Sequence, residues 1–189
     1  MYLLHLALLF FLIAALIAFV VFSFISMWAL ARARVPYVPL PSRALESVRG
    51  ALCVGESSVV YDIGCGDGKV LFYLAHHAPT AHYIGVENSP LPVLLARIRA
   101  LWHRLRYGTR VDIVNGDFFK HDFSRATHIF IYLFPSVMDE LLPILERSLT
   151  PGTRLVSATF KFKNKKYKEE VNLAGSKYKL ARTLYIYEF

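Results

Sequence analysis

Formal charge is missing from the first thirty residues of this 189-residue chain. Between Met1 and Leu30 there is no Lys, Arg, Asp or Glu, and the polar interruptions are His5, Ser23 and Ser26. About 20 helical residues cross the ~30 Å hydrocarbon core of a bilayer, so this run is long enough to span it. A soluble core of this size has no room for a helix that is apolar on every face. We therefore predict a transmembrane anchor over residues 1–30.

A charged segment ahead of the apolar run is also missing, although a secretory signal peptide requires one. The run is about twice as long as the roughly 7–15 apolar residues of such a peptide. Basic residues come afterwards instead, at Arg32, Arg34, Arg43 and Arg49. Positive charge marks the cytoplasmic flank of a span. The expected topology is a single-pass membrane protein with the N-terminus out and the remainder on the cytoplasmic or matrix-like side.

Cysteine is scarce, since the chain has two, Cys53 and Cys65. Their spacing matches no metal-ligand motif, and nothing in it indicates a disulfide framework. The histidines are scattered, and no carboxylate stands near the pair His76–His77. We expect no metal site and a reducing compartment.

The formal net charge of +8 falls entirely on residues 32–189. One basic cluster lies on a predicted helix and the turn after it, and another lies near the C-terminus. The members of these clusters are Arg97, Arg99, Arg104, Arg106 and Arg110, and Lys161, Lys163, Lys165, Lys166, Lys168, Lys177, Lys179 and Arg182. Such clusters attract anionic lipid headgroups or nucleic acid. For a domain held beside a membrane we expect the lipid bilayer as partner and no nucleic acid.

Three prolines, Pro36, Pro39 and Pro41, interrupt the chain after the apolar run. They exclude a continuous helix and favour an extended connector over residues 31–41. At most a dozen residues separate the anchor from the remainder of the chain, a reach of about 40 Å. Residues 42–189 are therefore expected to form a single domain close to the bilayer.

Strands and helices alternate through this domain. Helices are expected at 42–51, with Ser42 as N-cap, at 69–78, at 89–106 and at 136–149. In the third of these segments Leu94, Ile98, Leu101 and Leu105 recur at helical spacing. Strands are expected at 58–63, 82–87, 110–117, 127–134 and 153–160, with one loose turn in the nine residues between Asp117 and Thr127.

After Phe160 two strands joined by a loop at Gly175 predict an antiparallel hairpin. Alternation of strands and helices implies right-handed crossovers onto a parallel sheet. The predicted fold class is therefore α/β: a doubly wound, mostly parallel sheet with a C-terminal antiparallel hairpin, preceded by one transmembrane helix.

The first predicted strand runs into a glycine-rich loop, DIGCGDG, at residues 62–68. Glycines allow sharp turns and close approach of the backbone to a ligand. A dinucleotide-binding loop has the spacing G-x-G-x-x-G, whereas this one is G-x-G-x-G with Asp67 inside it. An acid there repels phosphate and suits a ligand with a positively charged amino group.

Two further acids stand at the ends of the next two predicted strands. Glu87 can accept hydrogen bonds from both hydroxyls of a ribose. Asp117, followed by Phe118, can bind an exocyclic amine and present an aromatic face to a base. Amino acid, ribose and adenine in that order describe S-adenosylmethionine.

The segments VVYDIGCGDGKV, YIGVENS and IVNGDFF resemble the successive cofactor motifs of class I, Rossmann-like methyltransferases. The resemblance covers residues 42–160 and implies that S-adenosylmethionine is the cofactor. It implies binding of the methionine portion around the loop, of the ribose at the second strand and of the adenine at the third. The residues implied are Asp62, Gly64, Cys65, Gly66, Asp67, Glu87, Asn88, Asp117 and Phe118.

The methyl acceptor is expected at the end of the fourth strand, at Tyr132, Phe134 and Pro135. Enzymes that methylate amide nitrogens or base amines often carry N-P-P-Y or D-P-P-Y there, and this chain lacks the polar first residue. An apolar, aromatic rim suits an aliphatic amine, although sheet packing explains Tyr132 and Phe134 equally well.

The segments YVPLP, VYDIGCGDGKV, YLFP and GTRLVSATF resemble the small membrane-anchored lysine methyltransferases of the ATP synthase c-ring protein and the adenine nucleotide translocase. This resemblance implies protein lysine side chains, in membrane proteins, as acceptors. Two alternatives stay open. One is a methyltransferase for a lipid or quinone-like small molecule, and the other is a non-catalytic adenosyl-binding membrane adaptor.

Overall fold

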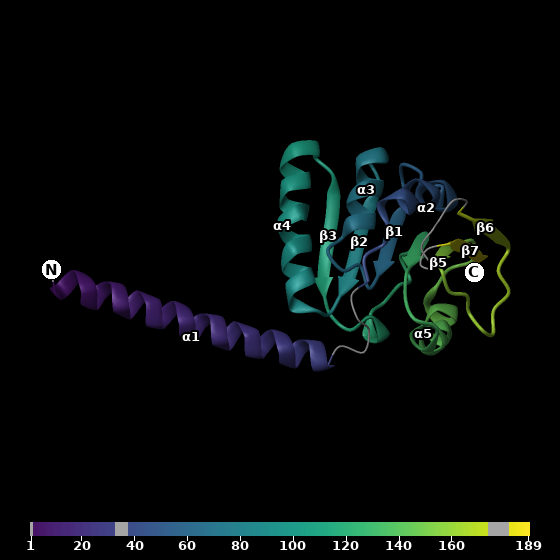
Figure 1. Cartoon of the computed structure of the whole chain (residues 1–189). Coiled ribbons are helices and arrows are strands. Elements are labelled where there is room, and N and C mark those ends of the chain that lie inside the picture. The colour runs from purple at the N-terminus through teal and green to yellow at the C-terminus, as the bar shows by residue number, and fades with distance from the viewer. Residues whose placement is uncertain (1, 33–37, 174–181) are drawn as a thin grey trace. The chain divides into compact units, whose positions relative to one another are not determined.

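The chain forms two compact units, Met1–Pro36 and Tyr37–Phe189. A computed structural model describes residues 2–32, 38–173 and 182–189 (Figure 1). Gly175, Lys177 and Lys179, which the sequence places in the hairpin loop and the second basic cluster, lie outside these residues.

The first unit contains one helix, α1 (Tyr2–Arg32). Its apolar side chains are exposed on all faces. The segment Tyr2–Ile25 has a mean hydropathy of 3.1 in its most apolar window, and none of that window is buried. By length and composition α1 is therefore a candidate membrane span.

The second unit is built on a seven-stranded sheet in the order β3-β2-β1-β4-β5-β7-β6 (Figure 1). The first five strands in the chain are parallel to one another, and β7 pairs antiparallel with both β5 and β6. This confirms the predicted doubly wound sheet with an antiparallel hairpin. The strands are β1 (Val59–Ile63), β2 (His82–Glu87), β3 (Arg110–Asn115), β4 (His128–Ile131), β5 (Arg154–Ala158), β6 (Glu169–Asn172) and β7 (Thr183–Glu188).

Helices α2 (Leu45–Leu52), α3 (Lys69–His77) and α4 (Pro90–Tyr107) pack side by side. The chain moves outward from β1 to β3 on one side and from β4 to β5 on the other. Right-handed crossovers therefore place α3 and α4 on one face of the sheet and α5 (Pro135–Ser148) on the opposite face. Strand order reverses between β1 and β4, which is where ligands bind in such sheets.

Two predicted segments differ in the structure. The helix expected from Ser42 begins with a short 3₁₀ turn, η1 (Ser42–Ala44), and Ser42 makes no capping hydrogen bond. The first strand of the hairpin is confined to β6, so the extended strand expected from Phe160 to Lys168 is wrong. Phe162 is buried there and its backbone N–H donates to the Tyr187 hydroxyl at 3.0 Å, which fixes this segment without a strand partner. The loose turn expected after Asp117 is present as η2 (Phe118–Lys120).

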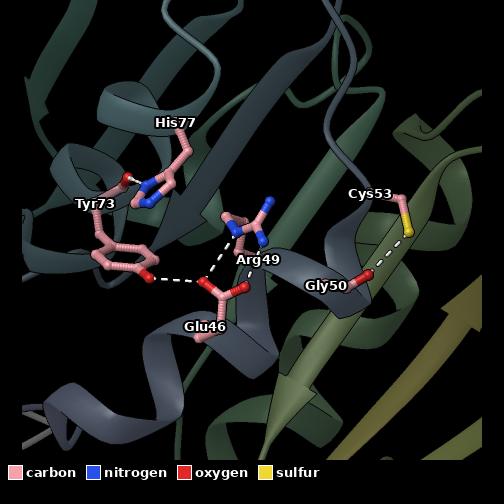
Figure 2. A network of polar contacts seen from close by, with 6 residues as sticks. All are labelled: Glu46, Arg49, Gly50, Cys53, Tyr73 and His77. Carbon is pink, nitrogen blue, oxygen red and sulfur yellow. Dashed lines mark hydrogen bonds and ion pairs between the residues drawn. The ribbon is translucent and has the colours of Figure 1, made fainter.

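A polar network joins α2 to α3 on the surface of the domain. Figure 2 shows the Tyr73 hydroxyl donating to the Glu46 carboxylate at 2.7 Å, while Arg49 donates to both oxygens of the same group. These bonds, that from Arg49 first, lower the pKa of Glu46 to about 2. At the end of α2 the Cys53 thiol donates to the Gly50 carbonyl at 2.9 Å (Figure 2).

Close packing in the core requires a glycine in β2. A Cβ atom at Gly85 would lie 2.5 Å from the Cys65 sulfur and 2.8 Å from a methyl group of Leu71. Gly85 pairs in register with Asp62 of β1, so this contact lies directly beneath the glycine loop. The side chain of Cys65 therefore fills the space that a larger residue in β2 would need.

We predict that Gly85→Ala lowers the free energy of unfolding by about 1–3 kcal/mol, because the new methyl group overpacks the core. Adding Cys65→Ala should recover part of this loss, so that the double variant is more stable than the sum of the single effects. Urea unfolding of the detergent-solubilised chain measures both.

The matched control is Gly50→Ala in α2, where a Cβ meets nothing within 4 Å. This change should leave stability unchanged or raise it by up to about 1 kcal/mol, because alanine favours a helix. Equal destabilisation by the two glycine substitutions would contradict the packing argument.

Candidate active site

Four strand ends meet at the carboxyl edge of the sheet, in the order β3, β2, β1, β4. The register aligns Glu87 with Asn115, Ile63 with Val86, and Ile63 with Ile131. Adjacent strands lie about 4.8 Å apart, so groups following these four ends occupy a row roughly 15 Å long. The structure thus brings all the predicted site segments to one edge.

Three glycines shape the loop after β1. Gly64, Gly66 and Gly68 have φ values of 77°, 56° and 77°, the left-handed region that favours glycine. A Cβ at Gly64 would lie 2.9 Å from Leu133, which follows β4, and a Cβ at Gly68 would lie 2.5 Å from the Phe72 ring. Glycine is therefore required here by both backbone geometry and close packing.

The Glu87 carboxylate points at this loop. One oxygen accepts a hydrogen bond from the Gly66 backbone N–H at 3.1 Å. The other accepts from the backbone N–H groups of Asn88 and Ser89, at 3.0 and 2.8 Å. In addition, the Gly116 N–H donates to the Glu87 carbonyl at 3.0 Å, which ties the end of β3 to the end of β2. Glu87 is thus fixed beside the loop and beside the segment that contains Asp117.

Asp62 is buried at the end of β1, with 3% of its surface exposed. Among the described residues, no hydrogen-bond donor reaches its carboxylate. Burial, with the nearby carboxylates of Glu87 and Asp67 adding to it, raises the pKa of Asp62 to about 8. A cationic group placed next to Asp62 would relieve this electrostatic cost.

Asp67 already has a cationic partner within the protein. Its carboxylate forms an ion pair with Arg99 of α4, which also donates to the Asp67 carbonyl at 3.1 Å. The other carboxylate oxygen accepts from the Lys69 backbone N–H at 3.3 Å. The Lys69 ammonium in turn donates to the Leu40 carbonyl at 2.8 Å. Asp67 therefore links the glycine loop to α4.

The two remaining predicted residues near the loop face in different directions. The Cys65 side chain is buried against Gly85, and burial raises the pKa of its thiol. The Asn88 side chain is exposed, and its amide oxygen lies 3.5 Å from the Ser89 hydroxyl. At Cys65, then, the backbone is the part that the site can use.

Asp117 caps the turn after β3. Its carboxylate accepts a hydrogen bond from the Phe119 N–H at 3.0 Å, while the carboxylate itself remains exposed. Phe118 is buried, and its ring lies 4.7 Å from that of Phe119. The half-buried Phe119, which the sequence analysis did not single out, is thus a second aromatic group at this end of the site.

The segment after β4 has mixed roles. The ring of Phe134 lies 6.0 Å from that of Phe160, which follows β5. Pro135 occupies the first turn of α5, where its missing N–H costs nothing. Tyr132 is half-buried, and burial raises its pKa while the neighbouring Thr159 opposes the rise. Its hydroxyl is therefore protonated at neutral pH.

Thr159 is a residue that sequence reasoning missed. Its φ is 74°, which is strained for a β-branched residue. The turn is closed by the Phe160 N–H donating to the Ala158 carbonyl at 2.9 Å and held by the Ser157 hydroxyl donating to the Phe160 carbonyl at 2.6 Å. Strained backbone of this kind gathers at functional sites, and the segment VSATF gives no sign of it.

No group of three or more His, Cys, Asp or Glu among the described residues is arranged to hold a metal ion. The site therefore consists of the glycine loop, three carboxylates and an aromatic rim. This is the arrangement that the sequence motifs predict.

Comparison with known proteins identifies the family. The ANTKMT methyltransferase domain matches residues 62–169 of the chain. The chain belongs to this family. The resemblance to class I methyltransferases, stated from three short motifs, is thereby confirmed, and so is the narrower likeness to the adenine nucleotide translocase type.

Three relatives extend the comparison. A protein-lysine N-methyltransferase of Saccharolobus islandicus is 35% identical over 81% of this chain and 92% of its own length. The lysine N-methyltransferase that acts on the c-ring protein of human ATP synthase is 32% identical over 71% of this chain, which spans 55% of that enzyme. A crystal structure of an RNA methyltransferase from Salinibacter ruber, in complex with S-adenosyl-L-homocysteine, has a TM-score of 0.71 and 33% identity, covering 80% of this chain and 93% of that one.

We predict that Asp62→Asn raises the melting temperature of the ligand-free protein by several degrees at pH 8 and above. The unfolded carboxyl ionises near 3.8 and the folded one near 8, so the folded state holds the extra proton and loses stability as pH rises between these values. The neutral amide does not suffer this loss. Calorimetry at pH 5 and pH 8.5 measures it, and a variant that melts lower than the parent at pH 8.5 would contradict the burial argument.

Proposed function

We propose that this chain is an S-adenosylmethionine-dependent methyltransferase that methylates lysine side chains of a protein at a membrane. The observation that carries the proposal is the Glu87 carboxylate bonded to the Gly66 N–H beside the buried Asp62. The family and the relatives from Saccharolobus islandicus and human support the lysine acceptor.

The cofactor assignments follow the row of strand ends. Asp62, a buried carboxylate without a cation, would bind the amino group of the methionine portion. Glu87 would exchange its bond to Gly66 for bonds to the ribose hydroxyls. Asp117 would accept from the adenine amine, with Phe118 and Phe119 beside the ring.

When bound, S-adenosylmethionine supplies a methyl group on a positively charged sulfur. The protein holds a lysine amine in line with that methyl group, which is worth several kcal/mol of barrier by positioning alone. The neutral amine forms the C–N bond as the C–S bond breaks, and the proton that it loses passes to solvent. The products are methyl-lysine and S-adenosylhomocysteine.

The acceptor side lies after β4 and β5. Phe134, Phe160 and Tyr132 supply apolar surface that favours the neutral over the charged form of an amine. The Tyr132 hydroxyl, protonated at neutral pH, can orient the amine but does not serve as a base. Pro135 fixes the start of α5 and thereby the direction of this segment.

The membrane part of the proposal rests on α1. Its length and apolar surface suit a span, and the basic residues after it favour an N-terminus on the outer side. The catalytic domain would then face the cytoplasm or an organellar matrix. The three parts of the chain would be the anchor at residues 1–30, the connector at 31–41 and the methyltransferase domain at 42–189, and a membrane-embedded or membrane-proximal protein would be the substrate.

We predict that S-adenosylhomocysteine binds more weakly as pH falls, with a dissociation constant that rises up to about tenfold per unit between pH 7.5 and 6. Its amino group stays protonated over this range, whereas Asp62, with a pKa of about 8, must lose its proton to bind it. Isothermal calorimetry of the detergent-solubilised chain measures the affinity. Asp62→Asn should bind weakly at every pH, and wild-type affinity that improves on acidification would refute the assignment.

We predict that the full chain transfers radiolabelled methyl groups from S-adenosylmethionine to membrane protein, and that acid hydrolysis recovers the label as methyl-lysine. Glu87→Ala, which loses the ribose contacts, is the inactive control. Label that extracts into organic solvent would favour a lipid or quinone-like acceptor, and label released by ribonuclease would favour RNA. Tight cofactor binding without any transfer would favour the non-catalytic adaptor.

A further inference from the structure

Helix α4 packs on the domain through a narrow face of small side chains. Val93 and Ala96 are buried, and Ala100 and His103 are half-buried. The His103 ring lies 4.8 Å from Phe72 of α3, and the helix runs along the neighbouring strand β3 (Figure 1). These positions recur every three or four residues, so they form one side of the helix.

The opposite side of α4 is apolar and open to solvent. Its side chains recur at the same helical spacing along almost the whole helix and are between 44% and 79% exposed. A soluble helix normally places such a row against the core. We name these residues the outer stripe: Leu94, Leu95, Ile98, Leu101, Trp102 and Leu105.

Arginines border the outer stripe on both sides. By helical periodicity Arg97 and Arg104 follow one edge, and Arg99 and Arg106 follow the other. Helix α4 contains no acidic residue. An apolar stripe with tryptophan, flanked by basic residues, is the pattern of a helix that lies in the plane of a membrane interface.

We propose that the outer stripe of α4 lies in the interfacial region of an anionic bilayer, with the flanking arginines bound to lipid phosphates. A second copy of the chain is a poorer occupant, because two such stripes would bring rows of arginine against each other without an acidic partner. The candidate span α1, joined to the domain by a connector that reaches about 40 Å at most, would keep α4 within range of the lipid surface.

This surface also connects to the site. Arg99, on one border of the stripe, is the residue paired with Asp67 in the glycine loop. The helix begins at Pro90, three residues after Glu87. Contact of α4 with lipid would therefore hold the carboxyl edge of the sheet, where the acceptor arrives, near the membrane surface. The interaction itself does not depend on methyl transfer.

Trp102 provides a direct probe, since the chain has two tryptophans and Trp28→Phe leaves it alone. We predict that, in the full chain with that substitution, Trp102 fluorescence is quenched by phospholipids brominated in their acyl chains and protected from aqueous acrylamide. The effect should be larger in vesicles of phosphatidylcholine and phosphatidylglycerol than in phosphatidylcholine alone, because of the arginines.

Adding Ile98→Glu should remove most of the lipid quenching, because it places a charge within the stripe at an exposed position. Lys166→Gln makes the same change in net charge outside α4 and should leave the quenching unchanged. Binding of S-adenosylhomocysteine that is unaltered by Ile98→Glu would show that the domain remains folded.

Two results would overturn the proposal. Trp102 that is fully open to acrylamide and insensitive to brominated lipid would show that the stripe faces water. Protection from acrylamide that grows with protein concentration, without lipid quenching, would show that a protein surface covers α4 instead.

Discussion

The hydrogen bond from the Gly66 N–H to the Glu87 carboxylate holds the site together. It joins the loop after β1 to the end of β2, and the Gly116 N–H extends the connection to β3 through the Glu87 carbonyl. The loop can take part only because its glycines adopt left-handed conformations and leave room for Leu133 and Phe72. One short segment thus places groups from neighbouring strands in a row.

Electrostatics gives this row a direction. Asp67 is neutralised by Arg99, and Glu87 accepts three backbone hydrogen bonds, but Asp62 is buried without a cation. A ligand with its positive charge at the β1 end and neutral hydroxyls at the β2 end therefore complements the site. The strained turn at Thr159 and the aromatic residues after β4 lie on the other side, away from the adenine-binding end.

The sequence predicted the sheet and the cofactor motifs well, because alternating apolar strands, glycine spacing and strand-end acids are local signals. Positions that depend on packing were less accessible. The segment after Phe160 has the alternation of a strand, yet Phe162 docks on Tyr187 and no strand forms before β6. The pairing of Asp67 with Arg99 joins residues far apart in the chain, and the strain at Thr159 leaves no trace in its neighbours. The apolar spacing of Leu94, Ile98 and Leu101 correctly predicted a helix, but not that this side faces outward.

The central claim is that Asp62 and Glu87 bind one S-adenosyl ligand between them. A crystal structure of the chain with S-adenosylhomocysteine tests it most directly. Our account predicts the ligand amino group beside Asp62 and the ribose hydroxyls within hydrogen-bond distance of Glu87, whose bond to Gly66 is then released. A ligand bound elsewhere, or one that leaves the Gly66–Glu87 bond intact and the ribose without a carboxylate partner, would contradict it.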